Sequence, residues 1–355
     1  MIATLHIPVT RVQQSRISHV DFHNLEFGKY ISDHMFSADY IGGEWKNTQI
    51  IPYGDLSVSP SSLALHYGQI VFEGMKAFRM RDGRISVFRI KKHLERLNRS
   101  LERMCMPQVS EELFVSAIHK LIETDRQWVP EQEQAALYLR PLIFASEPKL
   151  GVKISEQYKF LILASPAGAF YPKPLRVKVE TRYVRAAEGG TGFVKCAGNY
   201  GGAFYPTYLA KQEGYDQVLW TDAHEHRFLD ESGTMNLMFV VDGQLLTPPL
   251  SSTILDGVTR DSILQLARDM QFPCSEQKIS IQEIEQALHE GRVTEAFGTG
   301  TAAVVAPIKV IGIAGKDYTL PDWSEKSFMI RVKKILQDIR TGNLPDRHQW
   351  NYIIP

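Results

Sequence analysis

A ten-residue stretch, Ser165–Pro174, interrupts the apolar patterns of this chain near its middle. Its sequence, SPAGAFYPKP, holds three prolines and one glycine and follows neither a helical nor a strand period. Proline fixes one backbone dihedral and lacks an amide donor, so the stretch is typical of a connection between folded parts. With 355 residues in total, we expect two domains: a smaller N-terminal domain (1–165), a linker (166–175) and a larger C-terminal domain (176–355).

Strand-like and helix-like patterns occur on both sides of this break. Before it, the periodicity predicts helices over 90–106 and 111–124, and strands over 135–146 and 158–165. After it, strands are expected over 175–184 and 216–222, a hairpin turning at Asp242–Gly243, and helices over 261–270, 281–289 and 323–341. The mixture predicts an α/β (α+β) fold in two domains, with a ligand in the cleft between them.

The composition excludes several classes of partner. Forty Lys and Arg balance forty Asp and Glu, so no net charge favours nucleic acid or an anionic membrane surface. No apolar run is long enough to predict a transmembrane helix. The three cysteines have no metal-ligand spacing, and the two histidines within 222–227 lie in an expected turn. We expect a cytoplasmic protein without a metal site.

A glycine-rich stretch over 189–202 carries one lysine. Six glycines in fourteen residues surround Lys195, and Tyr200 follows five positions later. A lysine there is either a solvated surface residue or an amine held for nucleophilic chemistry. Glu231 lies at the start of a strongly apolar strand, where a buried carboxylate needs a cationic or proton-donating partner. That partner is either a salt-bridging side chain or the protonated ring of a pyridine cofactor.

Two further loops have the character of anion-binding sites. Residues 255–260, LDGVTR, lead into the helix expected from Asp261, and residues 298–303, GTGTAA, offer hydroxyls and small side chains. The second loop matches G-x-G-x-x-A, but the β-branched residues after it predict a strand where a dinucleotide fingerprint needs a helix. The sequence therefore does not predict a Rossmann nucleotide site, and it contains no P-loop.

Six segments in order resemble the fold-type IV pyridoxal-phosphate enzymes, and specifically the branched-chain aminotransferases. The matching segments are 65–79, 137–152, 194–202, 231–236, 254–260 and 295–303. The resemblance covers nearly the whole chain. It implies pyridoxal 5′-phosphate as cofactor, with pyridoxamine phosphate as its second form, in the cleft between the two domains. It also implies amino acids and 2-oxo acids as small-molecule partners, and a homodimer or larger assembly.

The resemblance assigns the cofactor site residue by residue. Lys195 is implied as the catalytic Schiff-base lysine, with Tyr200 on the phenolic oxygen and Glu231 on the ring nitrogen. Arg96 is implied as the phosphate-binding arginine. The other cofactor-binding residues that the family pattern implies are Thr234, Leu255, Val258, Thr259 and Thr301.

The same resemblance outlines the substrate site. Tyr67, Thr301 and the backbone of Ala302 are implied to hold the α-carboxylate. Arg140 at the pocket edge is implied to bind the distal carboxylate of glutamate and to tolerate an aliphatic chain in its place. The apolar wall is implied to comprise Phe72, Tyr138 and Phe170, with Leu150 and Val152 reaching in from the partner subunit.

The implied reaction is ping-pong transamination between leucine, isoleucine or valine and 2-oxoglutarate, with Lys195 moving the proton. A D-amino-acid aminotransferase or an aminodeoxychorismate lyase would share the lysine and the glutamate; the sequence YLRP around Arg140 favours the branched-chain group. A non-catalytic binding protein of the same fold is a third alternative. Some relatives have C-x-x-C where this chain has Ala303 and Ala306, so we expect no thiol switch of that kind.

Overall fold

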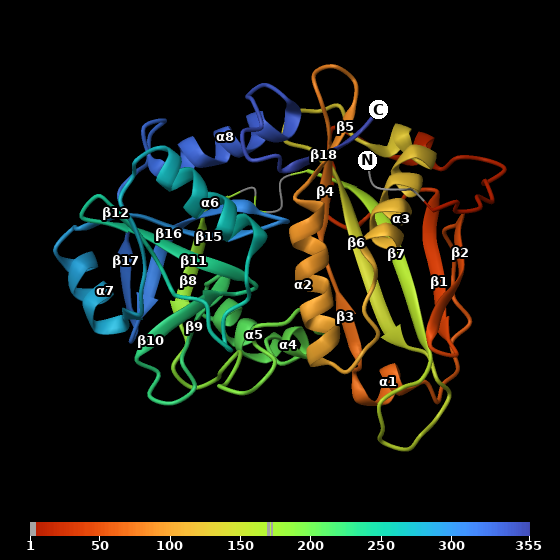
Figure 1. The fold of residues 1–355 in the computed structure, drawn as a ribbon. Helices are drawn as coiled ribbons and strands as arrows, with labels where there is room; N and C mark the ends of the chain where they lie inside the picture. The colour runs from red at the N-terminus through yellow and green to blue at the C-terminus, as the bar shows by residue number, and fades with distance from the viewer. Residues whose placement is uncertain (1–4, 169–170, 172) are drawn as a thin grey trace. The chain divides into compact units, whose positions relative to one another are not determined.

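A computed structural model describes residues 5–168, 171 and 173–355 of the chain. The chain divides into two compact units (Figure 1). The first comprises residues up to 170, 195–197 and 337–355, and the second comprises 171–194 and 198–336. This division differs from the sequence-based one at the C-terminus and at Lys195. In both places the segment hydrogen-bonds to a strand of the first unit, as described below.

The first unit is built on an eight-stranded sheet with the order β18-β5-β4-β6-β7-β1-β2, and β3 pairs with β6. The ten residues of β6 pair antiparallel with those of β7 along their whole length. The strands are β1 (His34–Ile41), β2 (Glu44–Pro52), β3 (Ile70–Phe72), β4 (Met75–Arg79), β5 (Ile85–Phe88), β6 (Ala136–Ala145), β7 (Tyr158–Ala167) and β18 (Asn351–Ile354). The helices are α1 (Leu63–Tyr67), α2 (Ile90–Arg103) and α3 (Glu111–Thr124), and α2 and α3 follow the expected bounds closely.

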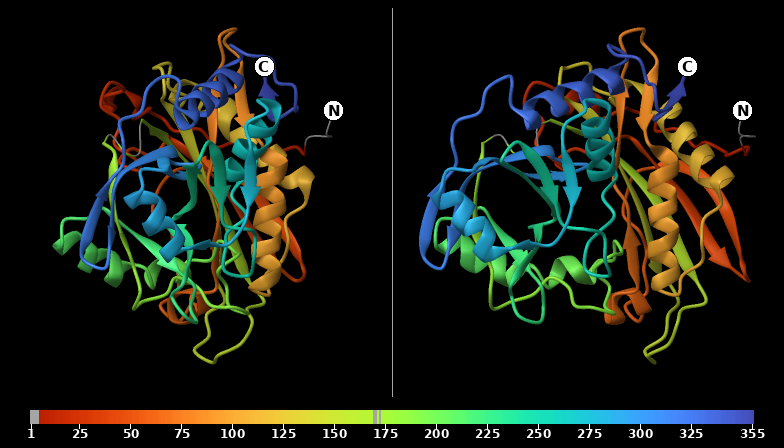
Figure 2. Two further views of the ribbon diagram at one scale, coloured as in Figure 1. Left: turned by 90° about the vertical axis from the view of Figure 1, so that its left-hand side faces the viewer. Right: turned by 60° about the vertical axis from the view of Figure 1, so that its left-hand side comes forward.

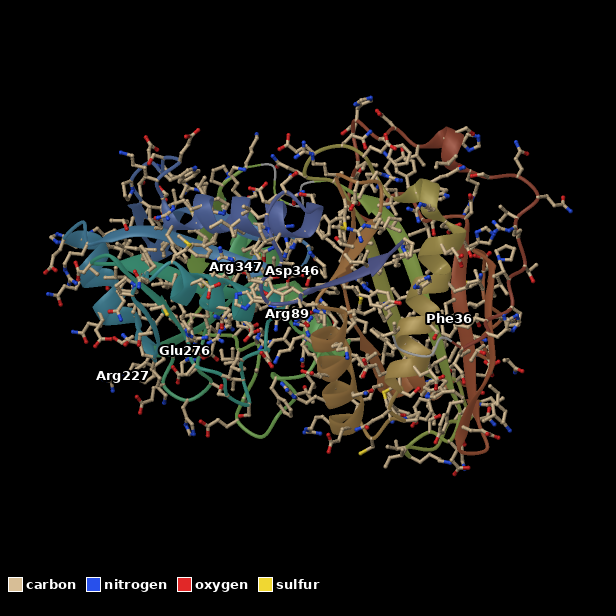
Figure 3. The ribbon with its side chains drawn as sticks, turned by 45° about the horizontal axis from the view of Figure 1, so that its top comes forward. Phe36, Arg89, Arg227, Glu276, Asp346 and Arg347 are labelled. Carbon is tan, nitrogen blue, oxygen red and sulfur yellow. The ribbon has the colours of Figure 1, made fainter. Side chains whose placement is uncertain are left out.

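The last strand explains why the C-terminal residues join the first unit. β18 pairs antiparallel with β5, from Asn351 opposite Phe88 to Ile354 opposite Ile85. Its start is fixed by the Asp346 carboxylate, which accepts the backbone N–H groups of Trp350 and Asn351 at 2.9 and 2.7 Å. Asp346 is labelled in Figure 3. The contact-based division thus places residues 337–355 with the first unit, where the sequence-based division placed them in the second domain, because a strand pairs by hydrogen bonds to distant residues that leave no local signal.

The second unit contains a ten-stranded sheet with the order β13-β12-β11-β15-β16-β8-β9-β10-β14, and β17 pairs with β16. Because β10 also pairs with β11, six of its strands form a closed ring (Figure 2). The strands are β8 (Leu175–Val179), β9 (Gln217–Thr221), β10 (Phe228–Ser232), β11 (Met235–Val241), β12 (Gln244–Thr247), β13 (Cys274–Glu276), β14 (Ile279–Ser280), β15 (Val293–Gly300), β16 (Val304–Ile313) and β17 (Lys316–Thr319). The helices that begin in this unit are α4 (Gly198–Gly201), α5 (Phe204–Gln212), α6 (Val258–Asp269), α7 (Ile281–His289) and α8 (Phe328–Thr341).

Several local predictions are confirmed in this unit. Asp242 and Gly243 both have positive φ, 49° and 76°, as the tight turn between β11 and β12 requires. The GTGTAA loop leads into strand β16, as expected from its β-branched residues.

Two helix starts differ from the prediction. Helix α6 begins at Val258, three residues before Asp261, with Gly257 in an extended conformation as its N-cap. Helix α8 begins at Phe328 instead of Trp323. The Glu295 carboxylate accepts the backbone N–H groups of Phe328 and Met329, so a side chain from β15 caps α8 at this point. In the described part of the chain, no helix is long and apolar enough to cross a membrane.

Candidate active site

The backbone of Lys195 is held against strand β3. Its carbonyl accepts the N–H of Phe72 at 3.1 Å, and the N–H of Ala197 donates to the carbonyl of Ile70 at 3.1 Å. Cys196, which lies between them, pairs with Val71 in an antiparallel β-bridge of the backbone. The lysine therefore lies on a short extended segment paired with a buried strand, although glycines surround it in the sequence. Its ammonium nitrogen lies 4.8 Å from the centre of the Phe72 ring.

Arg96, on helix α2, is held in a buried ion pair with Glu73. The Arg96 Nε and Nη2 atoms donate to the two carboxylate oxygens of Glu73 at 2.5 and 2.9 Å, and His93 Nδ1 lies 2.9 Å from Glu73 Oε2. All three residues are buried. Burial raises the pKa of Glu73, but the charges of Arg96 and His93 outweigh it, and the pKa of this carboxyl lies far below its usual value. The plane of the guanidinium is thereby fixed.

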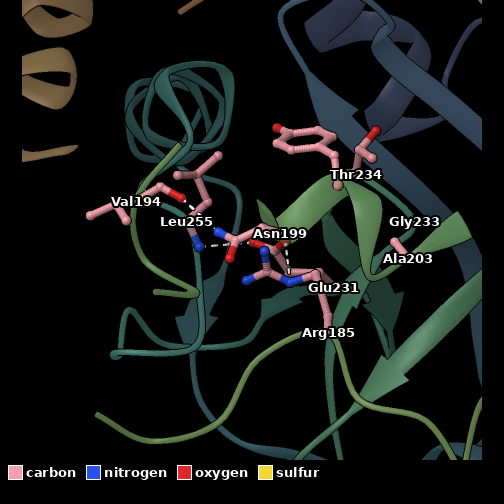
Figure 4. A pocket seen from close by; sticks show the side chains of 9 residues that line it. Arg185, Val194, Asn199, Ala203, Glu231, Gly233, Thr234 and Leu255 are labelled. Carbon is pink, nitrogen blue, oxygen red and sulfur yellow. Dashed lines mark hydrogen bonds and ion pairs between the residues drawn. The ribbon is translucent and has the colours of Figure 1, made fainter. Parts of the chain in front are cut away.

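A pocket in the second unit collects most of the residues expected around a pyridine ring. Tyr200 from α4, Glu231 from β10, and Thr234 and Leu255 from the following turns all line it (Figure 4). Arg185, Val194, Asn199, Ala203 and Gly233 complete the lining. Lys195 is the next residue in the chain after Val194. The short helix α4 replaces the irregular loop expected at Tyr200.

Glu231 is 2% exposed and has several partners in this pocket. Its Oε1 atom accepts the N–H of Leu255 at 2.9 Å and the amide of Asn236 at 3.0 Å. Its Oε2 atom lies 3.1 Å from Arg185 Nε. The need for a cationic partner, expected from the sequence, is thus met by Arg185 within the protein.

The two expected anion-binding loops lie at a helix start and at a strand turn. Val258 and Thr259 occupy the first turn of α6, where backbone N–H groups have no partner within the helix. Thr301 and Ala302 lie in the turn between β15 and β16 and are half-buried. The hydroxyl of the neighbouring Thr299 is buried and has no hydrogen-bond partner among the described residues. A phosphate or carboxylate oxygen would satisfy such a hydroxyl.

The expected substrate residues of the first unit gather around Arg140. Its guanidinium carbon lies 4.8 Å from the centre of the Phe72 ring and 5.3 Å from that of Tyr138. Arg140 Nη2 donates to the Tyr138 hydroxyl at 3.1 Å, and the Arg140 Nε atom is buried without a partner among the described residues. The guanidinium therefore lies over two aromatic rings.

The remaining substrate candidates lie on an exposed loop and on α1. The Tyr67 hydroxyl donates to the carbonyl of Leu150, while the side chains of Leu150 and Val152 are exposed, Val152 to 81%. Phe170 lies outside the described residues.

Three residues at these sites were missed by sequence reasoning. Glu73 and Arg185 are the ion-pair partners of Arg96 and Glu231, and Phe27 packs edge-on against Tyr138 with ring centres 4.8 Å apart. Arg185 stands ten positions before Lys195, just before the glycine-rich stretch 189–202, and only its ion-pair partner in the folded chain gives it a role. Phe27 is one of many aromatic residues and has no distinguishing pattern around it.

The chain matches the class IV amino-transferase family over residues 70–311. It belongs to this family. Branched-chain-amino-acid transaminase 1 of Bacillus subtilis is 45% identical over 332 residues, which cover 92% of this chain and 93% of that protein. The branched-chain-amino-acid aminotransferase of Mycolicibacterium smegmatis is 42% identical over 336 residues, covering 92% and 91%.

Solved structures share this fold. The branched-chain aminotransferase of Thermoproteus uzoniensis, solved with norvaline, has a TM-score of 0.75 at 25% identity, covering 91% of this chain and 100% of that one. The Escherichia coli branched-chain amino acid aminotransferase has a TM-score of 0.74 at 26% identity, covering 90% and 99%. The fold-type IV assignment is confirmed.

Class IV aminotransferases use pyridoxal phosphate, and the residues of the described sites fit this cofactor. Its aldehyde needs an amine, which Lys195 offers. Its protonated ring needs a buried acid, and Glu231 is one. Its phosphate needs a guanidinium fork, a helix start or small hydroxyl side chains; Arg96 on the first unit, and Thr259 and Thr299 on the second, are groups of these kinds.

Proposed function

We propose that this aminotransferase transfers the amino group of L-leucine, L-isoleucine or L-valine to 2-oxoglutarate, with Lys195 as its catalytic residue. The observation that carries the proposal is the setting of Arg140, a cation resting on the Phe72 and Tyr138 rings. The site must accept an apolar side chain in one half-reaction and the distal carboxylate of glutamate in the other. Aromatic surface serves the first need and a guanidinium serves the second.

Each cofactor residue is given one task. Arg96, Val258, Thr259 and Thr301 bind the phosphate, and Glu231 stabilises the protonated ring nitrogen. The Tyr200 hydroxyl donates to the phenolic oxygen, while Thr234 and Leu255 pack around the ring. Burial of Glu231 strengthens its attraction for a cationic ring, because little water screens the charges.

The chemistry then follows from the position of one amine. When bound, pyridoxal phosphate supplies an aldehyde that condenses with amines and a ring that accepts the electron pair left on Cα. Lys195 would hold the cofactor at rest, and its amine would be free once the substrate amine is bound in its place. That amine would then take the proton from Cα and give it back at C4′, acting first as a base and then as an acid. Tyr67, Thr301 and the backbone of Ala302 hold the α-carboxylate during this transfer.

We infer that the active unit is a homodimer. Leu150 and Val152 are apolar, exposed and carried on one loop, and in a dimer they would complete the side-chain pocket of the partner subunit together with Phe170 of that pocket. A cytoplasmic location is proposed from the cysteines, because Cys105, Cys196 and Cys274 are all free thiols.

Substrate assays and trapping of the lysine test the proposal together. The purified holoenzyme is offered L-leucine, L-isoleucine, L-valine or D-alanine with 2-oxoglutarate, and glutamate formation is measured. Borohydride reduction followed by peptide mapping identifies the residue bound to the cofactor. We expect the three branched L-amino acids to react. We expect the reduced cofactor, which labels the peptide, to be attached to Lys195. A preference for D-alanine, or a label that persists in Lys195→Ala, would overturn the assignment.

A further inference from the structure

Helix α2 carries a buried row of polar side chains. His93, Arg96 and Ser100 are three and four residues apart, so they lie along one side of the helix. Ser100 has no exposed surface at all. Polar groups are buried in this way when each has a partner. The partner of His93 and Arg96 is Glu73, and Ser100 bonds to the segment of Lys195.

Ser100 bonds in two directions. Its hydroxyl donates to the carbonyl of Arg96 at 2.9 Å and accepts the backbone N–H of Lys195 at 3.0 Å. The first bond is ordinary for a serine inside a helix. The second is not local, because it joins residues 95 positions apart in the sequence.

The second bond completes the anchoring of the Lys195 backbone. The carbonyl of Lys195 is bound by the N–H of Phe72, and its N–H is bound by Ser100. Strand β3 and helix α2 thus fix both polar atoms of the residue that carries the amine. Both bonds lie within the first unit.

The same helix orients the arginine assigned to the phosphate. The Glu73 carboxylate holds the Arg96 guanidinium along one edge by two hydrogen bonds, and His93 bonds the same carboxylate. Burial, together with the charges of Arg96 and Lys195, lowers the pKa of His93.

We propose that Ser100 is a positioning residue for Lys195, through which helix α2 sets the direction of the lysine amine relative to the cofactor. The inference rests on the proposed function of Lys195 and goes beyond it. Ser100 itself touches no reacting atom. Its loss should slow the step in which the lysine must meet the aldehyde carbon, because small errors of placement are costly in reactions between held groups.

The test separates binding of the cofactor from its attachment to the lysine. Pyridoxamine phosphate has no aldehyde, so its affinity for the enzyme does not depend on the lysine amine. Pyridoxal phosphate must condense with that amine, and the visible absorbance reports the bond. Enzyme freed of cofactor is mixed with each compound, and the reconstituted holoenzyme is assayed with L-leucine.

For Ser100→Ala we expect bond formation with pyridoxal phosphate and kcat to fall about tenfold or more, while pyridoxamine phosphate affinity and the KM for leucine stay within about twofold. Ser100→Cys keeps the volume with a much weaker acceptor and should behave like Ser100→Ala. Ser100→Thr keeps the hydroxyl and should recover most of the rate. Ser116→Ala, which removes another buried helical hydroxyl of this unit, is the matched control and should match the unaltered enzyme.

Unchanged bond formation in both Ser100→Ala and Ser100→Cys would overturn the proposal, as would an equal loss of affinity for pyridoxamine phosphate. Failure of the function itself has a different signature. In that case the unaltered enzyme would form no bond at Lys195, and Lys195→Ala would reproduce its behaviour.

Discussion

Arg185 Nε and Glu231 Oε2 lie 3.1 Å apart, and both side chains are more than nine-tenths buried. The protein therefore compensates the carboxylate before any cationic ligand arrives. Arg185 is itself anchored, because its Nη2 atom donates to the carbonyls of Gly192 and Thr253. The pair has the rigidity that a preorganised electrostatic site needs.

Breaking this pair from one side should destabilise the fold. Arg185→Met leaves the Glu231 charge buried without its cation, and we expect a loss of about 3–5 kcal/mol in the free energy of unfolding. The double variant with Glu231→Gln should lose less than the two single losses added together, since no unpaired charge then remains. Urea unfolding of the four cofactor-free proteins measures both quantities.

An exposed ion pair serves as the control for that cycle. Arg292 Nε lies 2.6 Å from Glu290 Oε2, but both side chains are about 40% exposed. Water and salt screen such pairs, so Arg292→Met should leave the unfolding midpoint nearly unchanged. Equal effects of Arg292→Met and Arg185→Met would show that burial gives the Arg185–Glu231 pair no special weight.

The Glu73–Arg96 pair predicts acid sensitivity. Folding lowers the pKa of Glu73, so the unfolded chain takes up a proton on this carboxyl at a higher pH than the folded chain does. The resulting stability is fully present above the unfolded pKa of about 4.3 and is lost as the pH falls below it, by up to about 1.4 kcal/mol per pH unit. Unfolding measured from pH 6 downward should therefore show a flatter profile below about pH 4.3 for Glu73→Gln. Parallel profiles for the two proteins would contradict the prediction.

Gly74 makes room for a substrate-pocket residue. A Cβ atom added at Gly74 would lie 1.9 Å from the Tyr138 hydroxyl oxygen. Gly74→Ala should therefore push Tyr138 out of its place in the apolar wall and lower kcat/KM for leucine by about tenfold or more. Steady-state assays check this, with Gly54→Ala as control because a Cβ at Gly54 meets nothing within 4 Å. A Gly74→Ala enzyme with unchanged kcat/KM would remove the proposed role of Tyr138.

The local features of the fold were within reach of the sequence. The spacing of apolar residues predicted α2 and α3, and the Asp242–Gly243 pair predicted a hairpin, because neighbouring residues determine these structures. The β18–β5 pairing was missed, since nothing in the sequence of residues 351–354 indicates a partner strand more than 250 positions away. The cap that Glu295 places on α8 was missed for the same reason.

The residues of the candidate site differ in the same way in how far the sequence could predict them. Lys195, Tyr200 and Glu231 are embedded in distinctive short motifs, so their identity could be predicted before their surroundings were known. Glu73 and Arg185 could not, because an ion pair is defined by two residues that meet only after folding. The local glycine content even misled about Lys195, whose segment is paired with β3 and not a loose loop.

Arg140 should decide between the two substrates of the reaction. Arg140→Met keeps an apolar side chain beside Phe72 and removes the cation. The hydrogen bond lost between the guanidinium and the distal carboxylate contributes about 1.5–3 kcal/mol. We expect kcat/KM for glutamate and 2-oxoglutarate to fall about 10- to 100-fold, with leucine changed by less than about threefold. Each half-reaction is measured separately, with Arg176→Met as the control, because Arg176 forms an exposed ion pair with Asp317 on the second unit. Equal losses for leucine and glutamate would show that Arg140 maintains the pocket without selecting between its occupants.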